Sequence, residues 1–237
     1  MGKSKDLATL KSGLSIDGTL TTTSTGTNLT SNSYNVVKIQ TDKDDNGSND
    51  DAILQFTTGS SNTVKGELRY DESESMFEIG QGDNQGHIRI DCSGRVTKPN
   101  QPMFHAYNST NDTFTTTEAK HNFNSTRINV GSHFNTSLSR FVAPTDGYYF
   151  FTWGGTITIT ANDPYITAYL RKNGASPGGM RTRANSTSGS GYRYWGAAGA
   201  EVQYMAANDY MEVYHYSQNG NASSASPEYV FTGFLIG

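Results

Sequence analysis

Residues 123–153 have the sequence FNSTRINVGSHFNTSLSRFVAPTDGYYFFTW, from which the architecture of the C-terminal half of this chain can be predicted. Near its end, Tyr149, Phe151 and Trp153 alternate along a predicted strand and so share one face of it. Gly147 permits a tight turn just before that strand. Phe134 and Phe141 are predicted to pack opposite these rings. The stretch therefore predicts a β-sandwich filled by aromatic side chains, and none of these residues looks like a chemical site.

The all-β character continues to the end of the chain. Runs at 148–152, 156–160, 166–170, 211–216 and 230–236 are rich in alternating or aromatic residues, as is typical of short strands. Turn sequences such as Lys172-Asn173-Gly174 and Asn208-Asp209 lie between them.

The spacing of eight residues in this half resembles the signature of the C1q-like family, which belongs to the superfamily of tumour necrosis factor. They are Phe123, Asn129, Phe134, Phe141, Gly147, Tyr149, Phe151 and Trp153. Only the last position departs from the family's signature, since Phe or Tyr is usual where this chain has Trp153. Segments 168–174, 206–213 and 231–236 look like the family's central hairpin, a late strand and the closing strand. The resemblance implies a ten-stranded jelly-roll head at residues 99–237, a homotrimer, and ligand binding through variable loops.

Residues 34–98 are predicted to form a small β-meander module. Short alternating runs recur at 37–39, 52–56, 68–70, 77–79 and 88–90, separated by turn clusters such as Asp44-Asp45-Asn46-Gly47. About five strands with one buried and one solvated face are expected. Because a single sheet with one thin apolar face is not stable by itself, the module must pack on another sheet or another copy.

Four segments of this module, at 52–56, 66–71, 76–80 and 87–91, look like modules of fibre and appendage proteins of tailed bacteriophages. The resemblance implies a shaft or shoulder, and phage proteins are known to use C1q-like heads at fibre tips. A linker, Lys98-Pro99-Asn100-Gln101-Pro102, follows the module. At the other end of the module, the N-terminal residues 1–33 include a Thr-rich polar tract with too little apolar surface to fold alone. This segment is predicted to be either an attachment peptide or a disordered tail.

Composition argues against several classes of function. A net charge of −4, a pI near 5.7 and the lack of a basic run disfavour nucleic acid as a partner. The single cysteine, Cys92, permits neither an intrachain disulfide nor a cysteine-rich metal site. No apolar stretch is long enough to span a membrane, and the first residues lack the apolar core of a signal peptide.

Candidate chemical sites are few. The loop from Asp42 to Gly47 matches the first half of a calcium-binding EF-hand loop, but Ile53 stands where the required Glu would be. The carboxylates Asp71, Glu72 and Glu74 could be proposed as catalytic residues, but they lie in a polar turn between two predicted strands, so catalysis is not expected. The five histidines, at positions 87, 105, 121, 133 and 215, show no metal-ligand spacing. The sequence therefore predicts no enzyme, no cofactor and no metal site.

One segment carries a binding hypothesis. Arginine and aromatic residues gather in a Gly/Ser/Asn-rich setting, and both residue types are preferred at recognition hot spots and suit sugars. They are Arg181, Arg183, Tyr192, Tyr194 and Trp195. The alternative interpretation is that Tyr192 and Tyr194 begin a strand and face the core.

These observations predict a homotrimeric fibre protein on the surface of a phage virion. Its N-terminal segment would contact other virion proteins and its head would bind a host-surface receptor or glycan. The alternative is a structural decoration or collar protein of the virion that binds no receptor. A complement-like secreted protein and a depolymerase fit less well, because a collagen-like or secretory N-terminus and a long β-helix with paired carboxylates are both missing.

Overall fold

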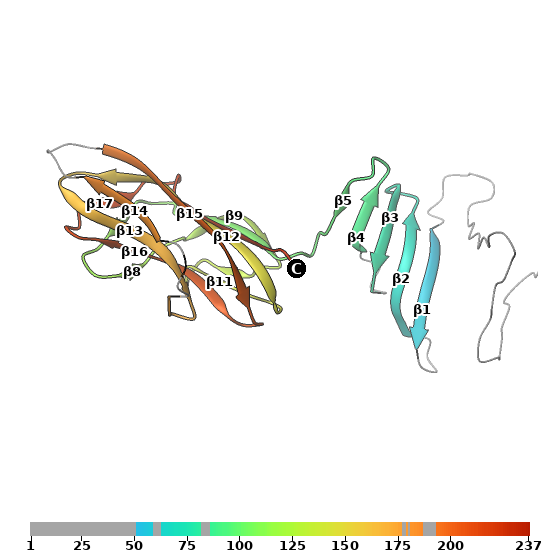
Figure 1. The fold of residues 1–237 in the computed structure, drawn as a ribbon. Helices are drawn as coiled ribbons and strands as arrows, with labels where there is room; N and C mark the ends of the chain where they lie inside the picture. The colour runs from blue at the N-terminus through green and yellow to red at the C-terminus, as the bar shows by residue number, and fades with distance from the viewer. Residues whose placement is uncertain (1–50, 59–62, 82–85, 177–178, 180, 187–192) are drawn as a thin grey trace, which may run out of the picture.

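The computed structural model describes residues 51–58, 63–81, 86–176, 179, 181–186 and 193–237. Their strands form three antiparallel sheets, one N-terminal and two in the head (Figure 1). The strands of the N-terminal sheet are β1 (Ala52–Thr58), β2 (Thr63–Asp71), β3 (Met76–Gly80), β4 (Gly86–Asp91) and β5 (Val96–Thr97). Among the described residues, no helix is long and apolar enough to cross a membrane.

The head is a sandwich of a six-stranded and a seven-stranded sheet. The six-stranded sheet contains β8 (Ala119–Lys120), β10 (Phe134–Asn135), β11 (Arg140–Val142), β13 (Asp163–Lys172), β14 (Arg181–Ser186) and β16 (Tyr210–Ser217). The seven-stranded sheet contains β6 (Met103–Tyr107), β7 (Asp112–Phe114), β9 (Ser125–Val130), β12 (Gly147–Ile159), β15 (Arg193–Met205), β17 (Ala222–Ser224) and β18 (Val230–Leu235).

The strand order confirms the all-β jelly roll. In the six-stranded sheet the order is β10-β11-β16-β13-β14, with β8 on β16; in the other it is β7-β17-β12-β18-β6-β9, with β15 on β12. Neighbouring strands are therefore mostly distant in sequence. The sheets hold more strands than the family's ten because edge segments such as β8 and β10 pair over only two residues.

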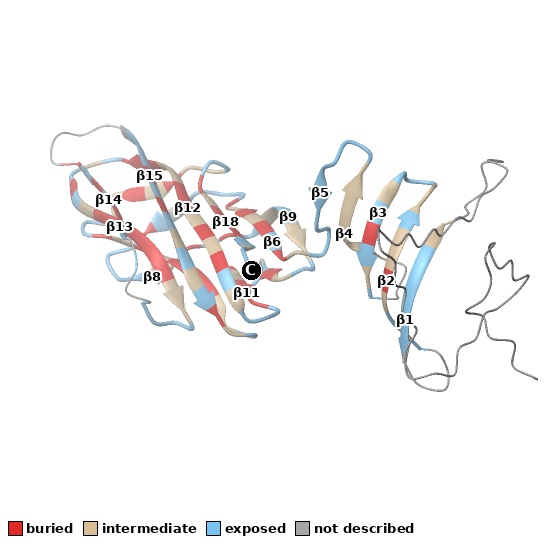
Figure 2. Cartoon of the chain, turned by 45° about the vertical axis from the view of Figure 1, so that its right-hand side comes forward, coloured by how far each residue is buried: buried red, intermediate tan, exposed pale blue. Residues whose placement is uncertain are grey.

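An aromatic layer fills the space between the two sheets of the head. Phe104 lies at its centre, with its ring stacked on those of Phe134 and Phe141 at 4.9 Å between centroids. The ring of Phe231 meets it edge-on at the same distance. All six aromatic members of the family spacing are buried, namely Phe123, Phe134, Phe141, Tyr149, Phe151 and Trp153. Figure 2 shows buried residues recurring along β12, as the period of a strand requires.

The two non-aromatic members of the spacing guide the path of the chain. The Asn129 amide donates to the Phe134 carbonyl and accepts from the Phe134 N–H, each at 3.0 Å, so it holds Phe134 at the core. Gly147 has φ +156°, and a Cβ there would lie 2.8 Å from Cδ1 of Leu235. A larger residue would therefore push the start of β12 away from β18.

The N-terminal sheet has the strand order β1 to β5, so it is a meander as expected. Four predicted runs lie in β1, β2, β3 and β4, whereas the run at 37–39 and residues 1–33 lie outside the described residues. The short β5 was not predicted, since two residues carry no detectable period. The proposed division of the chain into segments 1–33, 34–98 and 99–237 stays a prediction.

The two faces of this sheet are not buried as the alternation suggested. Apolar side chains are exposed on one face, while Glu78 on the other is 2% exposed. Glu78 is shielded because Arg69 and Arg89 flank it on the neighbouring strands and form ion pairs with it. The exposed apolar residues of the sheet's first face are Leu54, Phe56, Tyr70, Phe77, Ile79 and Val96. The expected need for another sheet or copy therefore applies to this apolar face.

The packing of Trp153 gives a test of the sandwich. Gly199 lies opposite Trp153 across the β12–β15 pair, and a Cβ at Gly199 would come within 2.4 Å of Trp153 Cζ2. We expect Gly199→Ala to lower the free energy of unfolding by about 1–3 kcal/mol, because the core is overpacked. Urea denaturation at one fixed protein concentration measures this change.

The control variant for this test is Gly196→Ala on the same strand, where a Cβ would meet nothing within 4 Å. It should change the free energy of unfolding little. Equal losses in the two variants would show that the space beside Trp153 is not tightly filled.

Candidate functional site

The outer face of the six-stranded sheet is covered by arginine side chains lying on tyrosine rings. Side chains of β13, β14 and β16 alternate between this face and the core. Ile166, Ala184 and Val213 are among the buried core residues, and their neighbours along each strand point outward. The guanidinium carbons lie 3.8–5.4 Å from the ring centroids in the pairs Arg181–Tyr169, Arg171–Tyr214, Arg140–Tyr210 and Arg183–Tyr165. We call these eight residues the arginine–tyrosine face.

Charge on this face is balanced unevenly. Glu118 forms ion pairs with Arg171 and Arg181. The pKa of Glu118 is lowered, first by a hydrogen bond with Tyr169 and then by the charges of these two arginines. Glu212 likewise pairs with Lys120 and Arg140. Among the described residues, no carboxylate lies within ion-pair distance of Arg183. Arg183 is therefore the arginine of this face that has no carboxylate partner in the part of the chain that the structure describes.

Arg183 also lines a hollow at the edge of this face. The hollow has a volume of about 350 Å³ and lies where β14 and β15 approach each other. Its lining residues are Pro164, Tyr165, Arg183, Ala184, Asn185 and Trp195. Two aromatic rings, a guanidinium and an amide thus surround one space, and the guanidinium can bind a carboxylate through two parallel hydrogen bonds.

The structure brings together part of the predicted receptor-contact set. Arg183 and Trp195 line the hollow, while Arg181 lies on Tyr169 within the same outer face. Tyr194 is 72% exposed and does not face the core. Tyr192 lies outside the described residues. Sequence reasoning missed Tyr165 and Asn185, because their nearness to Trp195 depends on how β13, β14 and β15 pack.

The outer face of the seven-stranded sheet is apolar and exposed. The strand register places one apolar residue from each of five strands in a continuous row, in the order Val130, Met103, Phe234, Phe150 and Val202. A second row contains the Tyr148–Tyr204 ring pair, at 5.5 Å between centroids. Tyr148, Val202 and Tyr204 are each about half exposed. We call the residues of these two rows the apolar face.

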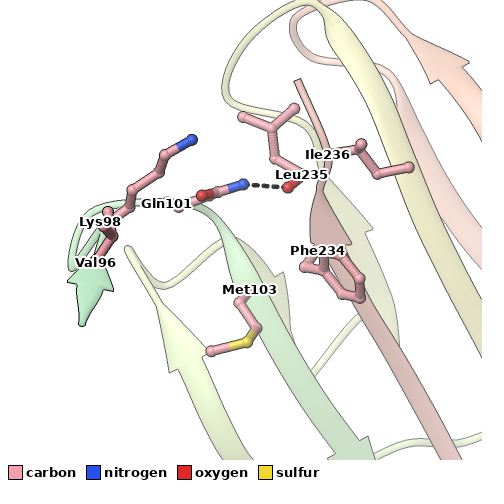
Figure 3. A pocket seen from close by; sticks show the side chains of 7 residues that line it. All are labelled: Val96, Lys98, Gln101, Met103, Phe234, Leu235 and Ile236. Atoms are coloured by element: carbon pink, nitrogen blue, oxygen red, sulfur yellow. Dashed lines mark hydrogen bonds between the residues drawn. The ribbon is translucent and has the colours of Figure 1, made fainter. Parts of the chain in front are cut away.

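The apolar face continues into a pocket beside the linker (Figure 3). The pocket, of about 420 Å³, is lined by Val96, Lys98, Gln101, Met103, Phe234, Leu235 and Ile236. The Gln101 amide donates a hydrogen bond to the Leu235 carbonyl there. A second bond, from Leu235 N–H to the Pro102 carbonyl at 3.0 Å, continues this contact. Residues of the linker thus lie against the end of β18.

Of the three carboxylates considered for catalysis, Asp71 has a local structural role. Asp71 accepts hydrogen bonds from the Ser73 hydroxyl at 2.7 Å and from the Glu74 N–H at 3.0 Å. These bonds close the turn between β2 and β3, and they lower the pKa of Asp71. The acidic loop 42–47 lies outside the described residues.

Two of the five histidines lie together in the core of the head. His121 and His215, which are 94 residues apart in sequence, lie side by side in the core with their Nδ1 atoms 3.1 Å apart. Asp112 lies next to them. Sequence spacing gave no sign of this cluster, because three separate strand segments bring its members together.

Comparisons with known proteins concern the head. The family model of the C1q domain matches residues 103–236. The chain is similar to the globular domain of zebrafish complement 1qA, with 16% identity, 58% of this chain and 98% of that chain covered, and a TM-score of 0.45. It is also similar to murine APRIL, with 11% identity, 57% of this chain and 99% of that chain covered, and a TM-score of 0.45. For Eiger TNF from S. frugiperda the identity is 12%, the coverage is 58% of this chain and 93% of that chain, and the TM-score is 0.44. No curated protein matches the chain.

Proposed function

The chain belongs to the C1q domain family, and we propose that it is a homotrimeric attachment protein whose head binds an anionic host-surface glycan. Domains of this family are typically trimeric binding modules without enzymatic activity. The observation that carries the proposal is that the head has two unlike outer faces. One is apolar and suits contact with other copies, and the other holds a hollow lined by aromatic rings and an arginine.

The apolar face supports self-association. Soluble monomers rarely expose contiguous apolar patches, and this face places Met103, Phe234 and Val202 in one exposed row. The N-terminal sheet also exposes an apolar face, which a trimer could cover by packing three sheets together. In this arrangement the linker residues beside β18 would keep the shaft close to the apolar face of the head.

The hollow supports recognition of a sugar that carries a carboxylate. The rings of Tyr165 and Trp195 offer flat apolar surfaces, Asn185 offers an amide, and Arg183 offers the charge that matches a carboxylate. A single hollow of this size would bind weakly. Three copies in one trimer would raise the strength of attachment to a surface by avidity.

The setting we propose is the surface of a bacteriophage virion. The support is the resemblance of the β1–β4 segments to modules of phage fibre and appendage proteins. Residues 1–33 would then contact other virion proteins, the N-terminal sheet would form a shaft or shoulder, and the head would be distal. A trimer that bound neither host cells nor their glycans would instead fit a structural decoration or collar protein.

The first prediction concerns assembly. Light scattering behind size exclusion should give a mass of about 77 kDa, three times the chain mass of 25.8 kDa. Val202→Glu should shift the protein towards monomer, because a carboxylate in a covered apolar contact has no partner. Val202 is 51% exposed within one chain, so the variant should keep its β-sheet circular dichroism.

The matched control for assembly is Gln218→Glu, which adds the same charge at an exposed turn outside the apolar face. It should remain trimeric. A wild-type protein that is monomeric at micromolar concentration, or a Val202→Glu variant that stays trimeric, would contradict the proposed role of the apolar face.

The second prediction concerns binding. Arg183→Ala and Trp195→Ala should each weaken binding to host cells or to an array of acidic glycans by about tenfold or more, as is expected when a hot-spot side chain is lost. Arg140→Ala is the control, because it removes the same charge and a similar stack on Tyr210 but lies outside the hollow. Equal losses in all three variants would indicate general attraction to charge, and unchanged binding in the first two would exclude the hollow.

A further inference from the structure

Three side chains with metal-binding atoms meet inside the head. Asp112 lies on β7 of the seven-stranded sheet, His215 on β16 of the six-stranded sheet, and His121 directly after β8. The Nδ1 atom of His121 lies 3.3 Å from Oδ2 of Asp112 and 3.1 Å from Nδ1 of His215. The third side of this triangle, from His215 Nδ1 to Asp112 Oδ2, measures 4.0 Å.

Hydrogen bonds among the three groups do not explain their convergence. The Nδ1 atoms of His121 and His215 lie 3.1 Å apart, so only one of the two can carry the proton between them. The distance of 4.0 Å is too long for a hydrogen bond. A single N–H at His121 Nδ1 donates either to His215 Nδ1 or to Asp112 Oδ2, and the His215–Asp112 contact has no hydrogen bond in either case. A cation between the three atoms would contact all of them.

The backbone and neighbouring rings hold the three groups in place. The Asn122 N–H donates to Oδ2 of Asp112 at 2.8 Å, and the His121 N–H donates to the Val213 carbonyl at 2.8 Å. The Phe114 ring stacks on His215 at 4.4 Å between centroids. Phe123 and Tyr229 flank the ring of His121, at 4.5 and 4.7 Å. The two imidazoles are thus pre-positioned by packed rings, and the carboxylate by a backbone hydrogen bond.

We propose that Asp112, His121 and His215 bind one divalent transition-metal ion of the zinc class through Oδ2, Nδ1 and Nδ1. Bond lengths of about 2.0–2.2 Å around a tetrahedral zinc ion put its ligand atoms roughly 3.3–3.5 Å apart. Two of the three distances are close to this value, and a small rotation of Asp112 shortens the third. Two imidazole nitrogens with one carboxylate favour zinc, cobalt or nickel over calcium and magnesium, which prefer oxygen ligands.

The site has one open side. The Asp112 side chain is 24% exposed, whereas those of His121 and His215 are almost fully buried. A metal ion would therefore enter past Asp112, and a water molecule would take the fourth position on that side. Unlike most metal-binding histidines, His121 has no hydrogen-bond partner at Nε2 among the described residues, so its orientation depends on the flanking rings.

The proposed role of the metal is to join the two sheets of the head. It would connect β7 to β8 and β16 at one end of the sandwich, where Figure 1 shows β8 beside β16. With a single cysteine, the chain has no intrachain disulfide to make such a connection. Because the ligand atoms converge only in the folded chain, metal binding would stabilise the folded state.

The test uses the full-length protein with its purification tag removed. After dialysis against Zn²⁺, elemental analysis should find one zinc per chain, and Co²⁺ should give the visible absorption of a tetrahedral site. The unfolding temperature should be several degrees higher in Zn²⁺ than in EDTA. Less than stoichiometric metal, with equal unfolding temperatures in Zn²⁺ and EDTA, would overturn the proposal.

Asp112→Asn is the main variant, because Asp112 is partly exposed while substitution of His121 could prevent folding. It should weaken Co²⁺ binding at least tenfold and abolish the Zn²⁺-dependent shift. Its unfolding temperature in EDTA should stay near that of the wild type in EDTA. His133→Gln, at a histidine outside the cluster, is the control and should keep both properties. An Asp112→Asn variant with an undiminished zinc shift would place the metal elsewhere and reject this site.

Discussion

The stacking of aromatic rings between the two sheets is the interaction on which the rest of the head depends. Phe104 touches rings from both sheets, since Phe134 and Phe141 come from the six-stranded sheet and Phe231 from the seven-stranded one. A few large aromatic side chains fill the interior, so the other residues of each strand are not needed in the core and can form the surface. The thickness of this layer also sets which residues across the sandwich can meet.

Only alternate side chains of each strand point into the core. The residues on the outer faces of the two sheets can therefore differ without changing the core. β12 and β18 direct aromatic side chains to both sides of the seven-stranded sheet, which leaves Phe150 and Phe234 in contact on the outside at 5.4 Å. The strands β13 and β14 instead direct arginine and tyrosine outward. One sandwich therefore presents a surface suited to its own copies and a surface suited to a polar ligand.

The cluster of Asp112, His121 and His215 follows from the same architecture. Polar groups buried at the end of an aromatic core must be satisfied by each other, by water or by an ion. Asp112 and His215 lie on different sheets, so an ion at this point would act across the layer that the aromatic rings fill. The stability of the head and its content of metal would then be linked.

The class of fold and the interior of the head could be predicted from local patterns in the sequence. The alternation of Tyr149, Phe151 and Trp153 and the turn at Gly147 are local features, and strand period and turn chemistry translate them directly into structure. The same was true of the meander from β1 to β4. Contacts between residues that are distant in sequence could not be predicted in this way. The row from Val130 to Val202, the hollow between Arg183 and Trp195, and the contact of His121 with His215 all depend on strand order and register. Register is set by long-range packing, which the spacing of residues along one chain does not record.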